Sequence, residues 1–434
     1  MLSGLLITSV CLAIAGAQEA NLQSCVPDGA FDPAVDYFPV KSQHINSDFS
    51  ISYANSFKTI VNNLTNQTII LYQCGTPRPD IPVGAKAFAI PLSSIGITET
   101  PIVTHLEALG LLGSVVASST SDFVTSPCFQ KRVDEIASFN ASVGAADVDI
   151  VFTSGFSQTD NDNEVRFDVT ISVDDESVGA RTQWIEFVAA FFNREQEAFR
   201  ILNEIEDAYE CLSEAATIQS TRPNVAWTTF TAPSEFNNNT ASWTISKAGY
   251  KQEFTRDAGA SMILPEQSVF STVQEFIREI FEADIVIDEG SEAFSSAREF
   301  ASVYGLNSSD FYFMKQNNVY QLNGRVNPAG GSAWFEEAVL YEHLVLADLI
   351  SITHPSLLPD HETVILRNVQ SEPENVVVTS DSCPGSATAA ATIPVTKCPA
   401  KIDAGSNLSS DASRVLEGAG FAFSIAMIGL SSLV

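Results

Sequence analysis

Three polar residues, Thr98, Glu99 and Thr100, lie at the junction between a predicted strand at 93–98 and a predicted helix at 101–112. The first backbone amides of a helix have no partner inside the helix. Together with neighbouring hydroxyl groups, they can hold an anionic or polar group of a ligand. Residues at this position can also act as a plain helix cap. Because the two roles are compatible, all three residues are candidate ligand-binding residues.

Arginine and tryptophan are scarce in this chain, and each could contact a ligand. A guanidinium group of Arg78, Arg181 or Arg256 could bind a carboxylate or an oxygen of a ferric chelate. A surface ion pair is the favoured alternative for arginines in so acidic a protein. Trp334 follows a Gly-Gly-Ser loop and is a candidate for stacking on a planar or sugar-like ligand. Trp227 lies in a strand-like run, which favours a place in the core.

The sequence contains none of the common catalytic or metal-binding motifs. There is no HExxH, GxSxG, Walker, GxGxxG or CxxC pattern, and there are only five histidines. Such motifs supply metal ligands, nucleophiles or phosphate-binding loops. We therefore predict that the chain is not an enzyme and holds no cofactor or metal of its own. The alternative is a glycan-active enzyme in which two of Glu99, Asp257 and Glu336 lie about 5–10 Å apart as acid and base.

The net charge of −31, from 22 basic and 53 acidic residues, restricts the possible partners. A surface this acidic repels nucleic acid and anionic lipid headgroups, so we expect no nucleic-acid partner. It suits a cationic ligand, although acidity can also serve only to keep an extracellular protein soluble. With 45% hydrophobic residues, the chain can bury a sizeable core.

Both ends of the sequence carry export signals. An apolar run followed by Ala-Gly-Ala predicts a signal peptide at 1–17. Small residues, a polar spacer and a terminal apolar segment predict a glycolipid-anchor signal at 406–434. An N-terminal anchor and a C-terminal transmembrane helix are the alternatives. We expect a monomer attached to the cell surface through its C-terminal lipid.

Cysteines and sequons agree with export. Six cysteines remain after the signal peptide, an even number that predicts disulfides in an exported chain. They are Cys25, Cys74, Cys128, Cys211, Cys383 and Cys398; spacing pairs the last two and leaves the other pairings open. Six N-x-S/T sequons predict surface glycosylation at Asn63, Asn66, Asn140, Asn238, Asn307 and Asn407.

Short apolar runs alternate with helical stretches on both sides of a long helical segment. Strands are predicted at 68–73, 86–91, 147–153, 224–230, 241–245, 283–288 and 318–322, and helices at 273–281 and 336–352. This rhythm predicts an α/β protein with mainly parallel sheets. Apolar residues at three- and four-residue steps without Pro or Gly predict one helix over 181–211, about 45 Å long.

These elements divide the chain into six parts. They are the signal peptide (1–17), an N-terminal α/β lobe (18–180), the connecting helix (181–213), a C-terminal α/β lobe (214–368), a Ser/Thr/Ala-rich stalk (369–405) and the anchor signal (406–434). Two lobes joined by one stiff helix leave a cleft between them. Ligands favour such clefts and the carboxyl ends of parallel strands.

Several segments resemble the periplasmic binding proteins of the iron–siderophore and cobalamin class, here in a eukaryotic cell-surface version. The most specific are QWIEFVAAFFNREQEA at 183–198 and the segment 327–361; LYQCGTPRP at 71–79, SIGITETPIVTHLEALG at 94–110 and YKQEFTRDAGA at 250–260 add to them. The resemblance covers roughly 49–368. It implies little hinge closure, a ligand between the lobes, and cleft-facing loops at Thr98–Thr100 and at Asp257, Ala258 and Gly259.

The function predicted from the sequence is capture of a small ligand at the cell surface, with ferric siderophores or related metal chelates as candidates. Family members in bacteria work with a permease and an ATPase, of which this chain has no sign, so transport does not follow from the resemblance. Two alternatives remain: the glycan-active enzyme, and a non-catalytic adhesion or structural protein whose cleft is filled.

Overall fold

A computed structural model describes residues 20–140, 147–155, 161–169, 177–290, 293–372, 374–394 and 396–399. The described residues up to Pro399 form one compact unit. The predicted signal peptide, the predicted anchor signal and Asn407 lie outside the described residues. Within those residues, no helix has both the length and the apolar character needed to cross a membrane.

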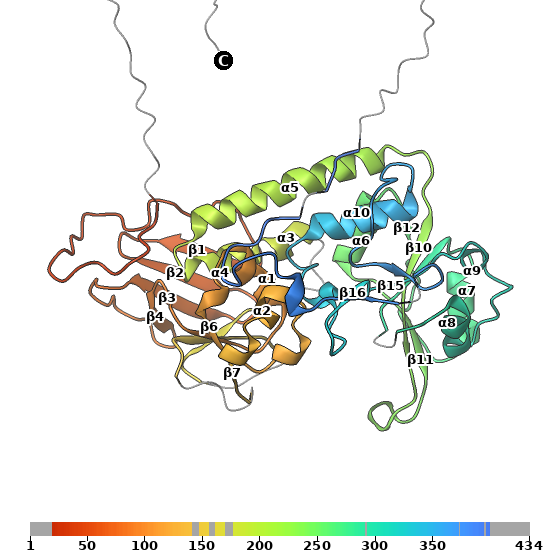
Figure 1. The fold of residues 1–434 in the computed structure, drawn as a ribbon, viewed down its shortest axis with the longest axis horizontal. Coiled ribbons are helices and arrows are strands. Elements are labelled where there is room, and N and C mark those ends of the chain that lie inside the picture. The colour runs from red at the N-terminus through yellow and green to blue at the C-terminus, as the bar shows by residue number, and fades with distance from the viewer. Residues whose placement is uncertain are drawn as a thin grey trace, which may run out of the picture. The chain divides into compact units, whose positions relative to one another are not determined.

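A mostly antiparallel sheet of four strands begins the fold (Figure 1). Its strands, in order, are β1 (Phe49–Tyr53), β2 (Phe57–Asn62), β3 (Gln67–Gln73) and β4 (Lys86–Ile90), and only β3 and β4 run parallel. The strands predicted at 68–73 and 86–91 are β3 and β4. Two of the three buried residues of β2, Lys58 and Asn62, are polar, so this strand has no apolar run to predict it.

A five-stranded parallel sheet completes the first lobe. Its strand order is β7 (Ala137–Ser138), β6 (Val115–Ser118), β5 (Ile95–Ile97), β8 (Ile150–Thr153) and β9 (Glu164–Arg166). β5 and β8 are buried along their whole length, as parallel strands covered on both faces are. Helix α1 (Pro101–Ala108) follows β5, and the short α2 (Pro127–Gln130) follows β6.

The second lobe is built on a seven-stranded sheet. Its order is β13 (Val269–Phe270), β11 (Ser242–Ile245), β10 (Asn224–Thr231), β14 (Ile285–Asp288), β15 (Val319–Gln321) and β17 (Arg367–Asn368), with β12 (Ser261–Met262) also paired to β10. The central strands β10, β14 and β15 are parallel. The predicted α/β class with mainly parallel sheets is therefore confirmed.

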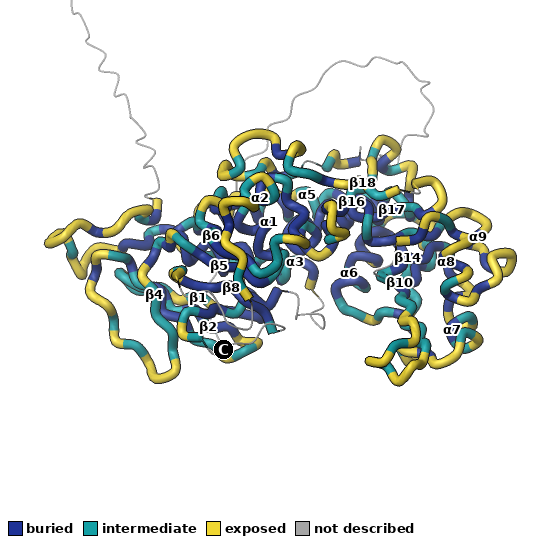
Figure 2. The backbone as a smooth tube through the Cα atoms, turned by 60° about the horizontal axis from the view of Figure 1, so that its bottom comes forward, coloured by how far each residue is buried: buried dark blue, intermediate teal, exposed yellow. Residues whose placement is uncertain are grey.

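Alternate residues of this sheet enter two different cores. Figure 2 shows much of the central strands β10 and β14 as buried backbone. Trp227 and Ile287 pack in the core that also contains residues of α6 (Gly249–Asp257) and α10 (Glu342–Thr353). Ala226 and Val286 pack in the core that contains residues of α7 (Val273–Ile280), α8 (Ala297–Tyr304) and α9 (Tyr312–Lys315). Because side chains alternate across a strand, the sheet is covered on both faces.

The prediction of one helix over 181–211 is wrong. The structure has three helices there, α3 (Val178–Thr182), α4 (Trp184–Ala190) and α5 (Glu195–Thr217). Asn193 adopts a left-handed conformation, with φ of 56°, and its Nδ2 donates to Leu22 O at 2.6 Å. Asn tolerates this conformation, so the chain ends a helix without Gly or Pro. The apolar spacing continues through the break because every residue of α4 is buried.

Helix α5 nevertheless joins the two lobes. Ile201, Leu202 and Ile205 pack in the core of the first lobe, while Leu212 and Ala216 pack in a core of the second. Its 23 residues span about 35 Å. Figure 1 shows α5 running above elements of both lobes, beside α10.

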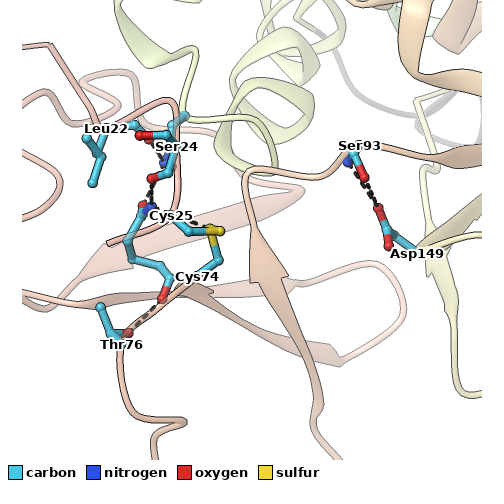
Figure 3. Close-up of a disulfide and its surroundings, with 9 residues drawn as sticks. Leu22, Ser24, Cys25, Cys74, Thr76, Ser93 and Asp149 are labelled. Carbon is cyan, nitrogen blue, oxygen red and sulfur yellow. Dashed lines mark hydrogen bonds between the residues drawn. A yellow bond between two sulfur atoms is a disulfide. The ribbon is translucent and has the colours of Figure 1, made fainter. Parts of the chain in front are cut away.

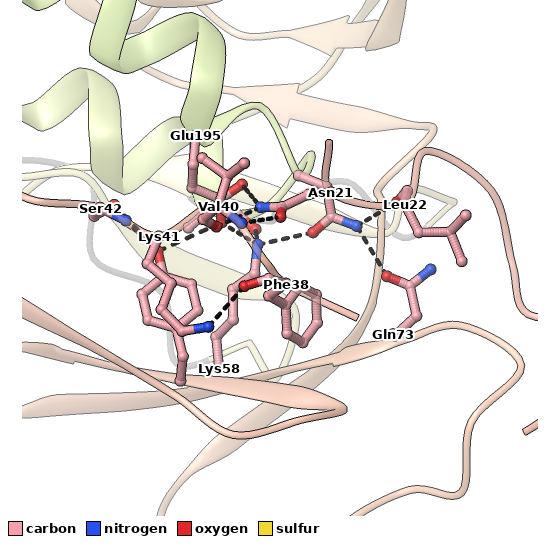
Figure 4. A network of polar contacts seen from close by, with 12 residues as sticks. Asn21, Leu22, Phe38, Val40, Lys41, Ser42, Lys58, Gln73 and Glu195 are labelled. Atoms are coloured by element: carbon pink, nitrogen blue, oxygen red, sulfur yellow. Dashed lines mark hydrogen bonds and ion pairs between the residues drawn. The ribbon is translucent and has the colours of Figure 1, made fainter. Parts of the chain in front are cut away.

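A buried polar network fixes the start of α5 to the first sheet (Figure 4). Lys58 and Glu195 form an ion pair with no exposed side-chain surface. Lys58 Nζ also donates to Ala190 O at 2.7 Å and Asn193 Oδ1 at 2.8 Å, and Asn21 Nδ2 donates to Glu195 Oε2 at 2.7 Å. Burial lowers the pKa of Lys58, while Glu195 acts in the opposite sense. These hydrogen bonds offset the cost of burying two charges.

The segment predicted as a separate stalk packs on the body of the protein from its start. β18 (Val376–Val377) pairs in parallel with β16 (Arg325–Val326) of the second lobe. Farther along, Ala391 N donates to Glu107 O at 3.0 Å, and a ring nitrogen of His343 lies 2.8 Å from Pro394 O. Ser, Thr, Ala and Pro give this segment no core of its own, so its composition alone suggested a spacer.

Two disulfides hold this segment, and they overturn the predicted Cys383–Cys398 pair. Cys383 is bonded to Cys128 in α2, and Cys398 is bonded to Cys211 in α5. The third disulfide joins Cys25 to Cys74 at the end of β3 (Figure 3). Nearness in sequence favoured the wrong pair. The contacts of Ala391 with Glu107 and of Pro394 with His343 hold the intervening segment on the protein, and each cysteine bonds to a partner far away in the chain.

The described sequons lie on the surface, as predicted. The side chains of Asn63, Asn66, Asn140, Asn238 and Asn307 belong to exposed residues. Their glycosylation remains a prediction.

Candidate functional site

A cavity of about 370 Å³ lies between the two lobes. Its lining is drawn from both of them. The first lobe contributes Glu99, Thr100, Thr120 and Phe123; the second contributes Glu289, Gly290, Leu322, Asn323, Gly330, Gly331, Ser332 and Phe335. A cavity of this size is at the small end of the range for ligand sites, about 300–1,000 Å³.

The wall from the first lobe comes from the carboxyl ends of parallel strands. Glu99 and Thr100 follow β5, and Thr120 follows the neighbouring β6. β6 and β8 flank β5 on opposite sides, so the order of strands reverses at this point and a crevice opens outside the strand ends. Glu99 Oε1 accepts a hydrogen bond from Ser154 Oγ, just beyond β8, at 2.7 Å.

The wall from the second lobe is built in the same way. Glu289 and Gly290 follow β14, and Leu322 and Asn323 follow its parallel neighbour β15. Glu289 forms an ion pair with Lys251, a buried residue of α6. The cavity is therefore the place where the carboxyl ends of parallel strands from two sheets meet.

Asp288, the last residue of β14, stabilises this second wall through hydrogen bonds. Its carboxylate accepts hydrogen bonds from Tyr304 Oη, from Gln321 Nε2 at 2.9 Å and from Gly290 N at 3.2 Å. Asp288 is almost wholly buried, and burial raises its pKa to about 6 despite these donors. The hydrogen bond to Gly290 fixes the backbone of a residue that lines the cavity.

Beside the cavity, the lobes are joined by contacts of Asn327, Gly331 and Glu336 with residues 122–126. We call this set of contacts the seam. Asn327 Nδ2 donates to Asp122 O at 2.7 Å and to Val124 O at 3.1 Å, on either side of Phe123. The backbone of Gly331 approaches so closely that a Cβ there would lie 2.2 Å from Phe123 O. Only glycine fits this contact between the lobes.

Glu336 completes the seam. Its two carboxylate oxygens accept hydrogen bonds from Thr125 N at 2.6 Å and Ser126 N at 2.9 Å. Its backbone oxygen accepts from Thr104 Oγ1 at 3.2 Å. The side chain is fully buried, and burial raises its pKa to about 8, while the amide donors act in the opposite sense. Second-lobe residues thus hold the backbone on both sides of Phe123.

No protein-family model matches this sequence, and no curated protein matches it. Solved structures with a similar fold are periplasmic binding proteins, the family named by the sequence motifs. A periplasmic heme-binding protein from Pseudomonas aeruginosa is 11% identical, with 65% of this chain and 99% of that chain covered and a TM-score of 0.45.

Two further solved structures give the same result. The periplasmic heme-binding protein HutB of Vibrio cholerae is 11% identical, covering 61% of this chain and 100% of its own, with a TM-score of 0.46. A periplasmic solute-binding protein from Veillonella parvula is 13% identical. The similarity covers 72% of this chain and 88% of that chain, with a TM-score of 0.46. These similarities concern the fold.

Two of the three candidates at the predicted strand-to-helix junction reach the cavity. Glu99 and Thr100 line it. Thr98 is buried beneath them, and its backbone N–H donates to Phe152 O at 3.0 Å. Thr100 precedes α1 but its side chain forms no capping hydrogen bond. The alternative of a plain side-chain cap is therefore not what the structure has.

Arg78 and Trp334 are placed away from the cavity. Arg78 is exposed on the loop after β3, four residues beyond Cys74. Trp334 is buried, with its ring centroid 6.0 Å from that of Trp227 and 6.4 Å from that of Tyr250. The Gly-rich loop before Trp334 does line the cavity, and of the two neighbouring aromatic residues it is Phe335, not Trp334, that lines it.

Asp257 and Gly259 also lie outside the cavity lining, contrary to the implication of the resemblance. Asp257 Oδ2 accepts from Tyr209 Oη at 2.9 Å. Gly259, with φ of 71°, packs so that a Cβ would lie 2.4 Å from Ala216 O and 2.7 Å from His354 Nε2. The reason is topological: these residues end α6, which follows the antiparallel β11, not a parallel strand that points at the cavity.

Glu289 and Gly290 line the cavity where that loop was expected, although neither was among the residues predicted from the sequence. The buried strand before them, predicted at 283–288, was the available signal. It resembles the strand at 147–153 in the first lobe, and residues directly after such a strand are candidates for a site.

The remaining candidates have structural contacts. Arg256 pairs with Glu253 and with Asp257, as the ion-pair alternative predicts, and Arg181 stacks on the ring of Tyr250 with its guanidinium carbon 4.3 Å from the centroid. Of the three carboxylates of the glycan-enzyme alternative, only Glu99 lines the cavity. Across the described residues, no group of three His, Cys, Asp or Glu side chains could hold a metal ion.

Proposed function

We propose that this chain is an extracellular solute-binding protein that captures a small ligand in the cavity between its lobes. One observation carries the proposal: carboxyl ends of parallel strands from two separate sheets line the same cavity. Loops at such strand ends are the usual place for ligand-binding groups in open α/β sheets.

The seam supports binding without large closure. Asn327, Gly331 and Glu336 attach the second lobe to residues 122–126 of the first, directly beside the cavity. A cavity whose walls are held in this way does not have to be ordered when the ligand enters, which favours affinity.

Export and anchoring form part of the proposal. The signal peptide at 1–17 and the anchor signal at 406–434 would place the protein on the outside of the cell. Three disulfides are typical of proteins in oxidising compartments. The family resemblance suggests a ferric siderophore or a related metal chelate, which would bring its own metal.

Calorimetric titration with ferric siderophores, haem and cobalamin, together with mass spectrometry of small molecules that copurify from the native source, tests the function. We expect one ligand per chain at micromolar concentration or below. Thr100→Trp, which fills the cavity, should abolish binding. Thr221→Trp, at an exposed site outside the cavity lining, is the matched control. Equal binding by wild type and Thr100→Trp would show that the cavity is not the site.

A further inference from the structure

We propose that the ligand is a small organic cation with an aromatic or other apolar part. This inference rests on the proposed function of the cavity as a ligand site; for the ligand itself, it favours a small cation over the ferric siderophore or metal chelate that the family resemblance suggests. It is drawn from the chemical groups that the cavity presents, and it concerns two carboxylates, two phenyl rings and the volume between them.

The charge of the lining is acidic. Glu99 and Glu289 both line the cavity, and no Lys, Arg or His is among the described lining residues. Lys251 offsets part of this charge from behind Glu289. An anionic ligand would meet the carboxylates of Glu99 and Glu289 without a Lys, Arg or His in the described lining, whereas an ammonium or guanidinium group would be attracted by them.

The net charge of the whole molecule also favours a cationic ligand. Its net charge of −31 attracts cations and repels anions at long range. This field cannot select a ligand by itself, but it raises the association rate of a cation and lowers that of an anion.

Two phenyl rings supply the apolar part of the site. Phe123 and Phe335 come from opposite lobes, each at the end of a 3-10 helix, and both line the cavity. They are 59% and 61% exposed, although most of the phenylalanines that the structure describes are buried. Phenyl faces bind apolar rings and also attract cations. The backbone around Phe123 is held by Asn327 and Glu336, so the main chain that carries this ring has a fixed position beside the cavity.

The size of the cavity limits the ligand. A volume of about 370 Å³ suits a molecule with one or two rings and a short charged arm, at the small end of ordinary ligand sites. Three indoles of nearly equal size form a matched series of probes: tryptamine is a cation, indole-3-ethanol is neutral and indole-3-propionate is an anion.

Calorimetric titration of the purified chain with these three probes, at low and at physiological ionic strength, tests the inference. We expect tryptamine to bind at least about tenfold more tightly than indole-3-propionate, as hydrogen bonds to charged groups predict. Glu99→Gln keeps an oxygen that can accept from Ser154 and removes the charge. It should weaken tryptamine about tenfold and leave indole-3-ethanol unchanged. Phe123→Ala should weaken all three probes.

Two control variants test whether losing a carboxylate or a phenyl ring elsewhere on the surface changes the affinities. Glu279→Gln changes an exposed carboxylate of α7, and Phe236→Ala changes a fully exposed phenyl ring, both outside the cavity lining. Both should leave every affinity unchanged, and unfolding midpoints should confirm that each variant is folded.

Three outcomes would overturn the inference on ligand charge. They are equal or tighter binding of the anion, an unchanged preference in Glu99→Gln, and binding of none of the indoles while Thr100→Trp abolishes binding of another ligand. In each case the proposed function would survive. If no compound and no copurified molecule bound in the cavity, the proposed function itself would fail.

Discussion

Glu336 Oε2 accepts a hydrogen bond from the backbone N–H of Thr125 at 2.6 Å, across the boundary between the lobes. The two residues are 211 positions apart in the chain. A buried carboxyl group of the second lobe is therefore attached to the main chain of the first, next to a ring that lines the cavity. This contact relates the stability of the protein to the shape of its site.

Glu336→Ala should lower the free energy of unfolding by about 2–6 kcal/mol, because it leaves the buried amides of Thr125 and Ser126 without an acceptor. Glu336→Gln keeps one acceptor oxygen and should lose about half as much. Urea denaturation measures both values. Glu279→Ala, at an exposed position, should change the free energy by less than about 0.5 kcal/mol. A loss below about 1 kcal/mol in Glu336→Ala would show that the seam contributes little.

Asp288 predicts a dependence of stability on pH. Its pKa is raised to about 6 by burial, so between about pH 4 and pH 6 the folded state holds a proton that the unfolded state releases. Stability therefore falls as the pH rises through this window. The shift of about 2 pH units corresponds to about 3 kcal/mol.

Asp288→Asn should remove this contribution, since the amide does not titrate. An Asn oxygen can still accept from Gln321 and Gly290, while its NH2 group can donate to Tyr304. Denaturation at pH 4, 5, 6 and 7 should show the stability of the variant rising relative to wild type by about 3 kcal/mol. Glu336, whose pKa is raised to about 8, titrates in both proteins and cancels from the difference. Parallel curves for the two proteins would contradict the assignment.

The disulfide pairing is open to direct measurement. Peptide mapping without reduction should yield peptides linked through Cys25–Cys74, Cys128–Cys383 and Cys211–Cys398. A peptide linked through Cys383 and Cys398 would contradict the structure. Replacing both Cys128 and Cys383 with Ser should lower the free energy of unfolding by about 2–5 kcal/mol, because the C-terminal segment loses its bond to the first lobe.

Gly259 should matter for stability and not for binding. In Gly259→Ala the new Cβ would approach Ala216 O and His354, and the left-handed conformation would add strain, so we expect a loss of about 1–3 kcal/mol. Gly84→Ala is the matched control, since Gly84 has φ of 83° and open space where a Cβ would lie. Calorimetry should find the same ligand affinity in both variants as in wild type. Weaker binding by Gly259→Ala, but not by Gly84→Ala, would show that Gly259 contributes to the ligand site.

The elements that the sequence predicted well are those with continuous apolar runs. Strands β3, β4, β8, β10 and β14 fall within or close to their predicted ranges. Of these, β8 and β14 are buried along their whole length, and such parallel strands are largely apolar. Strand β2 was missed because its inward face carries Lys58 and Asn62, whose partners lie far away in the chain. The break between α4 and α5 was missed because it depends on one left-handed asparagine.

The site was predicted only in part, because only some of its residues are marked by a local sequence pattern. Glu99 and Thr100 could be found because a local pattern, a strand followed by a helix, marks their position. Trp334 and Phe335 are neighbours in sequence, yet one is buried and the other lines the cavity. No local pattern distinguishes them, since the difference depends on which residues of the other lobe cover each ring.

The sequence by itself determined the α/β class, the strong negative charge, the even number of cysteines and one edge of the cavity. These depend on composition and on the spacing of nearby residues, which act through local backbone preferences and total charge. Only the tertiary structure decided the cysteine pairs, the fixed seam and the second edge of the cavity. Each of these is a contact between residues far apart in the chain, such as Thr125 and Glu336, and exists only after both lobes have folded and met.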